Sequence, residues 1–196
     1  MRFRIPCSTA VLSEARLYAI ESSSHTMDYD GWKDQHNKLE RLTYGKYAQL
    51  WVHEWCRING IPCVKDKSSP KEPDDNDLTI CEHQIDVKAS VIPQLLGQIS
   101  PGMYRRSDGF YCFILTDKQC SFVMPAGFIH CSLFLPFSEE VEQGKKIPGT
   151  EIVQRFGRSR FLNKGAPVVP FFEFMADARA GALSKHIPEI QAEVPF

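Results

Sequence analysis

Two short strands joined by a tight turn constrain the fold of this chain more than any other feature. In residues 78–80, and again in residues 84–90, aliphatic and β-branched side chains alternate with polar ones on either side of a polar break. Such alternation predicts β-strands, in which successive side chains point to opposite faces. Asp86 and Lys88 therefore share one face of the second strand, roughly 7 Å apart. The stretch predicts a β-hairpin with one apolar and one polar face.

The position of the turn decides which residue faces Asp77, the aspartate directly before the first strand. If the turn falls at residues 82–83, Asp77 lies opposite Lys88. If it falls at residues 81–82, Asp77 lies opposite Asp86. Both registers gather the three side chains on one face, so the pattern leaves the choice between them open.

Two carboxylates on adjacent strands form a site for a hard divalent cation. Mg²⁺ takes oxygen ligands and usually keeps waters and phosphate oxygens in its remaining positions. Asp77 and Asp86 would supply carboxylate oxygens, and the backbone carbonyl of Val87 would supply a further one. The ammonium of Lys88 could orient or help deprotonate an attacking water and balance charge that develops on a phosphate. The hairpin therefore predicts a Mg²⁺ or Mn²⁺ site with a lysine beside it.

Residues 85–90, Ile-Asp-Val-Lys-Ala-Ser, with an acidic residue at the start of the preceding strand, resemble the PD-(D/E)xK superfamily of restriction-endonuclease-like nucleases. The first acidic residue of that motif corresponds to Asp77, which adjoins the apolar strand, or to Asp74, which follows a proline. Asp75 is a third alternative. The resemblance covers residues 38–124. It implies an α/β fold with a restriction-endonuclease-like core, in which a mixed sheet of about five strands is flanked by helices.

The activity that this resemblance implies is that of a Mg²⁺- or Mn²⁺-dependent endonuclease, which hydrolyses phosphodiester bonds in DNA. The alternatives are a non-catalytic DNA-binding or protein-interaction module on the same scaffold, a nuclease directed to RNA, and a plain surface hairpin. The intact set of Asp77, Asp86 and Lys88 favours catalysis, since a degraded site would have lost at least one of them. Dimers are common among enzymes that cut both strands, which makes a homodimer a candidate assembly.

The clearest helix is predicted over residues 38–59. Its apolar residues recur at spacings of three and four, so they form one continuous stripe. Gly60 provides the stop, because glycine readily adopts the left-handed backbone that ends many helices. The stripe consists of Tyr44, Tyr47, Ala48, Trp51, Val52, Trp55 and Ile58.

Glu40 extends this stripe back by one turn. Its carboxylate would reach the two aspartates, and the resemblance makes it an accessory catalytic residue. Glu40 also fits a capping box with Asn37, in which it would satisfy only a backbone N–H. Both interpretations stay open. Gln49 is an alternative accessory position, although it lacks a carboxylate.

A basic segment lies at residues 145–164. It holds six lysines and arginines against one acidic residue, Glu151, which gives +5 in a chain with a formal net charge of −1. Arginines can grip phosphates with two hydrogen bonds, and the interleaved Phe156 and Phe161 could stack on exposed bases. The alternative is a solvated loop that the two phenylalanines anchor to the core. The residues expected to bind DNA are Arg155, Arg158, Arg160 and Lys164.

The rest of the chain predicts one domain with an appendage. A chain of 196 residues, 43% of them hydrophobic, can bury a substantial core. An unbroken apolar run at residues 110–116 predicts a central strand covered on both faces, and residues 120–124 are expected to pair with it. We expect residues 1–36 to form an N-terminal appendage and residues 37–196 a single nuclease-like domain, in which residues 125–196 elaborate the core.

Composition argues against several other classes of protein. A net charge of −1 rules against a uniformly basic coat, so contacts with DNA must come from a local patch and bound cations. No stretch approaches the length of a membrane-spanning helix, and the start of the chain lacks the apolar segment of an export signal. Seven cysteines without a CxxC pair are unsuited to structural zinc and typical of a reducing cytosol. We therefore expect a cytoplasmic protein without membrane contact.

Overall fold

Nine strands and four α-helices make up the described part of this computed structural model, which comprises residues 4–6, 8–24, 35–65, 77–91, 108–147, 151, 153–154 and 159–188. The strands are β1 (Ile5–Pro6), β2 (Cys63–Lys65), β3 (Leu78–Ile80), β4 (His83–Val91), β5 (Phe110–Thr116), β6 (Phe122–His130), β7 (Ser138–Val141), β8 (Ser159–Leu162) and β9 (Val169–Pro170). The α-helices are α1 (Thr9–Ser23), α2 (Gln35–Ile58), α3 (Cys131–Phe134) and α4 (Phe171–Arg179), and a 3₁₀ helix follows at Leu183–His186.

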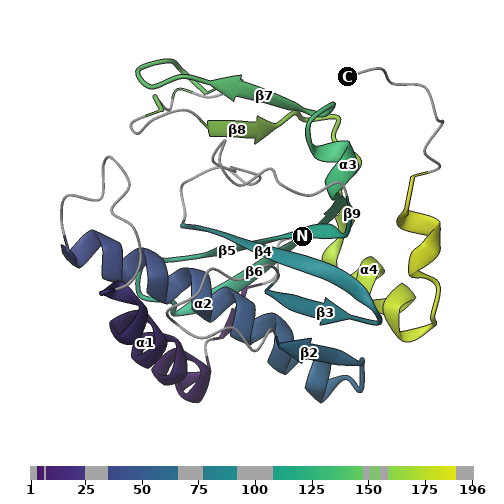
Figure 1. Ribbon diagram of the computed structural model, residues 1–196, viewed down its shortest axis with the longest axis horizontal. Helices are drawn as coiled ribbons and strands as arrows, with labels where there is room; N and C mark the ends of the chain where they lie inside the picture. The colour runs from purple at the N-terminus through teal and green to yellow at the C-terminus, as the bar shows by residue number, and fades with distance from the viewer. Residues whose placement is uncertain are drawn as a thin grey trace.

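The main sheet is curled and mixed and has the outline of a half-barrel (Figure 1). Its strands follow the order β2-β3-β4-β5-β6, and both β1 and β9 pair with β6. β4 and β5 run parallel, whereas the other paired strands run antiparallel. Their crossover connection, which parallel neighbours require, passes through residues 92–107, outside the described residues. The predicted α/β class and mixed sheet are confirmed, with seven strands rather than about five.

The hairpin predicted around Asp77 forms with its turn at residues 81–82. Both turn residues have positive φ angles, 46° and 71°. This backbone is that of the two-residue turn whose twist matches the twist of the flanking strands. The ladder pairs Leu78 with Ile85, so Asp77 lies one step beyond it, facing Asp86. The register that places the two aspartates together is confirmed, and the alternative register is wrong.

Helix α2 covers one face of the sheet (Figure 1). The helix predicted at residues 38–59 is confirmed and begins earlier, at Gln35. Its stripe packs against Ile85 and Val87 of β4 in the main core. Ile58 was expected in that stripe, but it is the last residue of α2 and is 68% exposed. The stripe residues that are buried are Tyr47, Ala48, Trp51 and Val52.

Helix α4 packs on β6 and completes the same core. The Phe174 ring stacks on Phe128 of β6, with the ring centres 3.8 Å apart and the planes 11° from parallel. Asp177 fixes the following 3₁₀ helix, because it accepts hydrogen bonds from Lys185 at 2.8 Å and His186 at 2.7 Å. In the described part of the chain no helix is long and apolar enough to cross a membrane.

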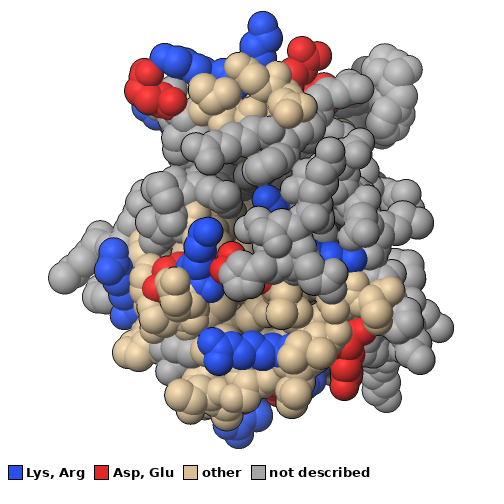
Figure 2. Space-filling model, turned by 90° about the vertical axis from the view of Figure 1, so that its left-hand side faces the viewer, with Lys and Arg blue, Asp and Glu red and all other residues tan. Residues whose placement is uncertain are grey.

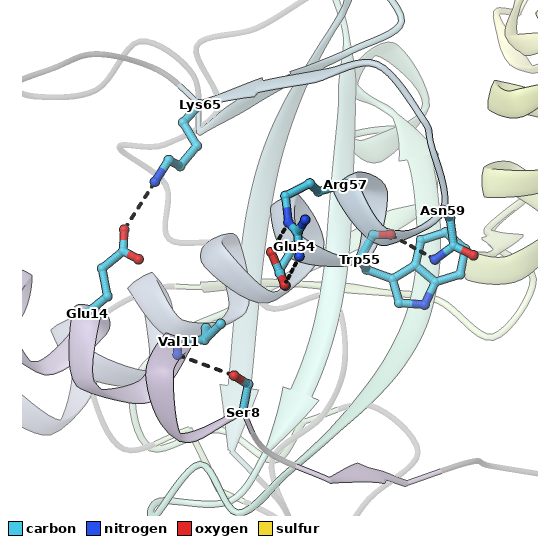
Figure 3. A network of polar contacts seen from close by, with 8 residues as sticks. All are labelled: Ser8, Val11, Glu14, Glu54, Trp55, Arg57, Asn59 and Lys65. Carbon is cyan, nitrogen blue, oxygen red and sulfur yellow. Dashed lines mark hydrogen bonds and ion pairs between the residues drawn. The ribbon is translucent and has the colours of Figure 1, made fainter.

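Helix α1 lies against α2 and joins the main core through Val11 and Ala15 (Figure 1). The N–H of Val11 donates to the Ser8 hydroxyl at 3.5 Å, which caps the start of the helix. Glu14 forms an ion pair of 3.1 Å with Lys65 of β2 (Figure 3). These contacts tie a helix from the predicted N-terminal appendage to both α2 and the sheet.

The opposite face of the sheet carries a second, smaller apolar cluster. Tyr111 and Phe113 of β5 pack there against Phe134 of α3. β7 and β8 form a separate two-stranded sheet beyond this face (Figure 1). Its own apolar cluster consists of Val141, Ile147 and Phe161.

Candidate active site

The polar side of the hairpin holds Asp86 and Lys88. The two side chains form an ion pair in which the Lys88 Nζ lies 2.8 Å from the Asp86 Oδ1. They are 16% and 18% exposed, so the pair is mostly enclosed but still open to solvent. In the parallel ladder Asp86 neighbours Tyr111, and the Lys88 Nζ lies 5.9 Å from the centre of the Tyr111 ring. The strand thus presents a charged pair beside an aromatic surface.

Asp77 completes the group from the neighbouring strand. Its Oδ2 accepts a hydrogen bond of 2.6 Å from the backbone N–H of Val87. By the register of the hairpin, its carboxyl faces Asp86 of β4. The predicted convergence of the two aspartates on one site is therefore present. Val87 takes part through its N–H, and the predicted contribution of its carbonyl to metal binding stays a prediction.

Burial raises the pKa of Asp77 to about 7, and the neighbouring charge of Asp86 adds to the effect. The Lys88 ammonium and the Val87 N–H act in the opposite direction, because both favour the carboxylate. Near neutral pH the metal-free site therefore keeps Asp77 protonated for a large part of the time. The two aspartates are crowded enough that a positive charge between them is favourable.

We expect the metal-free protein to lose stability as the pH rises through about 7. The folded pKa of Asp77 lies above its ordinary value of 3.8, so its contribution is fully present below that value and lost as the pH passes the folded pKa. Asp77→Asn keeps a neutral side chain at all these pH values and should flatten this part of the profile. Urea unfolding in EDTA, at pH values from the ordinary pKa of Asp77 to its folded pKa, measures the difference in stability between the wild type and Asp77→Asn.

The control for this profile is Glu82→Gln, which removes an exposed carboxylate from the turn of the same hairpin. Its pH profile should follow that of the wild type. A profile of Asp77→Asn that falls as steeply as the wild type would show that Asp77 does not hold the proton.

Gln49 is a site residue that the sequence indicated only weakly. Its side chain is 3% exposed on the buried face of α2. The Gln49 Nε2 donates a hydrogen bond of 2.6 Å to the backbone carbonyl of Asp77. Helix α2 therefore holds the main chain at the point where Asp77 enters the site. Gln49 acts by positioning, and the signal for it in the sequence was the resemblance, which made it an alternative accessory position one residue after Ala48.

Gln49→Leu should lower the free energy of unfolding by about 1–3 kcal/mol, because it leaves the Asp77 carbonyl without its donor. Leucine fits the apolar surroundings, so the lost hydrogen bond dominates the effect. The change is measured by urea unfolding at a fixed pH. The matched control is Gln84→Leu at an exposed position of β4, expected to change stability by about 0.5 kcal/mol or less. Equal effects in the two variants would contradict the positioning role.

No protein-family model, curated protein or solved structure matches the chain.

Glu40 is not brought to the two aspartates. It forms an ion pair of 3.8 Å with Lys118, and its side chain is 28% exposed. Among the residues that the structure describes, no three His, Cys, Asp or Glu side chains are arranged to hold a metal ion. The capping-box interpretation is also wrong, because α2 begins at Gln35 and Asn37 lies inside the helix. Asp74 and Asp75, the alternatives to Asp77, lie outside the described residues.

In the structure, part of the positive charge of the basic segment is engaged by acidic and polar groups of the chain itself. Arg160 of β8 donates hydrogen bonds to the Ser138 carbonyl at 3.1 Å and to its hydroxyl at 3.2 Å, and it lies 3.9 Å from Glu140. Lys146 pairs with Glu151 at 2.5 Å. Figure 2 shows side chains of both signs around this two-stranded sheet, at the top of the molecule. The expected DNA contacts of Arg160 thus compete with internal bonds.

The other predicted DNA-binding residues are placed differently. Lys164 lies in the turn after β8 and is exposed. Arg155 and Arg158 lie outside the described residues. DNA binding by this segment stays a prediction.

Proposed function

We propose that this chain is a metal-dependent nuclease that hydrolyses phosphodiester bonds in DNA on a restriction-endonuclease-like core. The observation that carries the proposal is the meeting of Asp77, Asp86 and Lys88 at the start of one hairpin. Lys88 pairs with Asp86, and Asp77 faces Asp86 from the adjacent strand, so two carboxyl groups and one ammonium belong to one site. The mixed sheet with helices on its face is compatible with the proposed core.

The donor set fits Mg²⁺ or Mn²⁺. Mg²⁺ is commonly held by one or two carboxylates, with waters and substrate phosphate oxygens in the remaining positions. Asp77 and Asp86 provide such a pair. Burial raises the pKa of Asp77 and the charge of Asp86 adds to the effect, and a cation would offset the repulsion between the two carboxylates. When bound, the metal ion would supply Lewis-acid stabilisation of the negative charge that develops on the phosphate.

Lys88 is the residue that would act on the reacting atoms. Its ammonium is held 2.8 Å from Asp86, so its direction is set by one of the carboxylates that would bind the metal. In that position it can hold the attacking water and stabilise charge on a non-bridging phosphate oxygen. The water oxygen bonds to phosphorus and gives up a proton, and the bond from phosphorus to the leaving sugar oxygen breaks as that oxygen takes up a proton. Gln49 and the Val87 N–H keep Asp77 in place during this step.

The proposal is tested by incubating the full chain with supercoiled plasmid DNA, linear DNA and single-stranded RNA. Each substrate is offered with Mg²⁺, with Mn²⁺ and with EDTA. We expect nicking or linearisation of the plasmid with either metal and no cleavage in EDTA. Cleavage of RNA alone would favour the RNA-directed alternative. Binding of DNA without cleavage under any metal would favour the non-catalytic module and overturn the proposal.

A further inference from the structure

The outer side of helix α1 carries two exposed apolar side chains. The inner side packs against α2 and buries Val11, Ala15 and Ala19. Leu17 and Ile20 are 64% and 59% exposed. At 3.6 residues per turn, both lie on the side of the helix opposite the buried residues. Helix α1 therefore presents an apolar face to solvent on the outside of the molecule (Figure 1).

Four exposed residues make up this face, which we call the outer seam. They follow one another at spacings of four, three and four, so they form one stripe along the helix. This is the spacing at which two helices pack side by side, with the side chains of one between those of the other. The seam is apolar at its centre and ends in a small polar residue on each side. Its members are Ser13, Leu17, Ile20 and Ser24.

Charged residues on the two sides of the outer seam indicate what covers it. Arg16 borders the seam on one side, and Glu14 and Glu21 border it on the other. Glu14 is engaged by Lys65 at 3.1 Å. The ion pairs formed within the described residues include neither Arg16 nor Glu21, and both side chains are exposed. One side of the seam is therefore basic and the other acidic, which makes the seam complementary in charge to a second copy of itself.

The orientation of the second copy depends on which sides meet. In an antiparallel pair, each side of the seam faces the same side of the partner helix, because that helix is turned end over end. Glu14 and Glu21 would then face a second pair of acidic residues, which is unfavourable. In a parallel pair, opposite sides meet and a residue faces the one five positions later, so Arg16 faces Glu21 of the partner subunit. The two-fold axis repeats this contact, and the charges therefore favour the parallel pair.

We propose that the outer seam is a homodimer interface, in which α1 packs in parallel against α1 of a second copy of this chain. The inference is independent of the proposed nuclease activity, because it uses no residue of the candidate active site. Leu17 and Ile20 of each copy would bury their exposed surface across the two-fold axis, with an Arg16–Glu21 pair on either side. One helix from each copy makes a small interface, so the dimer is weak and exchanges with the monomer.

Sedimentation equilibrium of the full chain tests the proposal, at protein concentrations from about 1 to 200 μM. We expect the wild type to shift from monomer to dimer within this range. Leu17→Glu and Ile20→Glu should each stay monomeric, because they place a charge at the centre of the seam. Both positions are exposed, so circular dichroism should show that these variants keep the fold. A wild type that is monomeric at every concentration would overturn the proposal.

Ile58→Glu is the matched control. Ile58 is 68% exposed at the end of α2, and it does not belong to the outer seam. This variant should form dimers over the same range of concentration as the wild type. If Ile58→Glu is monomeric while Leu17→Glu still forms dimers, the interface lies elsewhere and the proposal is wrong.

Exchanging the two charges tests the pairing across the interface. Arg16→Glu should weaken the dimer by about 10-fold at low ionic strength, because both Arg16–Glu21 pairs become repulsive. Glu21→Arg should weaken it to a similar degree. The double variant R16E/E21R restores opposite charges in the reversed sense and should recover the dimer. A double variant as weak as the single ones would contradict the predicted contact.

A cysteine introduced near one end of the seam tests the orientation. In the parallel pair, position 13 of one copy lies beside position 13 of the other. In an antiparallel pair it would lie beside position 24, and the two copies of position 13 would be roughly 16 Å apart along the helix. Under mild oxidation Ser13→Cys should therefore form a disulfide between two copies, identified by peptide mapping after digestion. A dimer that forms without this cross-link would overturn the parallel arrangement.

Discussion

Asp86→Asn is expected to lower the rate of DNA cleavage by at least ~100-fold while leaving the protein folded. The change removes one of the two carboxylates that would bind the metal, so calorimetry should show weaker Mg²⁺ binding. It also removes the charge of Asp86 next to Asp77, which should lower the pKa of Asp77.

Lys88→Met should reduce cleavage to a similar degree by a different route. It should bind Mg²⁺ at least as well as the wild type, because a competing positive charge has gone.

The control for both variants is Glu82→Gln, in which the same hairpin loses a carboxylate at its exposed turn. This variant should cleave DNA at the wild-type rate. Circular dichroism and affinity for DNA in EDTA separate a lost reaction from a lost fold or lost binding. If Asp86→Asn or Lys88→Met cleaves as fast as the wild type, the hairpin is not the catalytic centre.

Phe174→Ala is expected to lower the free energy of unfolding by about 3–5 kcal/mol. The side chain is 0% exposed, stacks on Phe128 and meets the edge of Phe110 at 5.0 Å between ring centres. Truncation would leave a cavity where α4 meets the sheet. Because native domains are stable by only about 5–15 kcal/mol, this loss is a large share of the total. Urea unfolding at a fixed temperature measures it.

Phe172→Ala is the matched control, two residues earlier on the same helix. Its side chain is 45% exposed, although it still approaches Trp55 at 6.1 Å between ring centres. We expect it to lower stability by about 1 kcal/mol or less. Similar losses of stability in the two variants would mean that the buried stacking of Phe174 on Phe128 is not what α4 contributes to the core.

The sequence predicted those elements whose patterns are local. The apolar stripe of α2 and the apolar run of β5 are each complete within one segment of the chain. Each element could therefore be predicted without knowing what it packs against. The hairpin was also predicted, but its register was left open. The choice depended on whether Cys81 and Glu82 both adopt positive φ angles, which neither residue type favours strongly. The site was predictable to the extent that it lies on this hairpin.

Contacts between distant parts of the chain could not be predicted in the same way. The hydrogen bond from Gln49 to the Asp77 carbonyl joins residues 28 positions apart, and no periodic pattern in the sequence predicts it. Arg160 lies 22 positions from Ser138 in the chain. A count of charges along the segment could not show that its guanidinium donates a hydrogen bond to Ser138 across the two-stranded sheet. Glu40 lies on α2, as the helical periodicity predicted, but it pairs with Lys118. The pattern of one helix cannot show which residue of another segment its side chain will contact.

The parallel pairing of β4 and β5 has a consequence for the order in which the protein folds. A hairpin with a two-residue turn closes within about 1–10 μs, because its strands are adjacent in the chain. The β4–β5 pair joins two strands that are separated in the chain by the residues between Val91 and Phe110, and such non-local pairing slows folding. Asp77, Asp86 and Lys88 all belong to the fast hairpin. We therefore expect the carboxylates and the ammonium to meet early, before the sheet around them is complete.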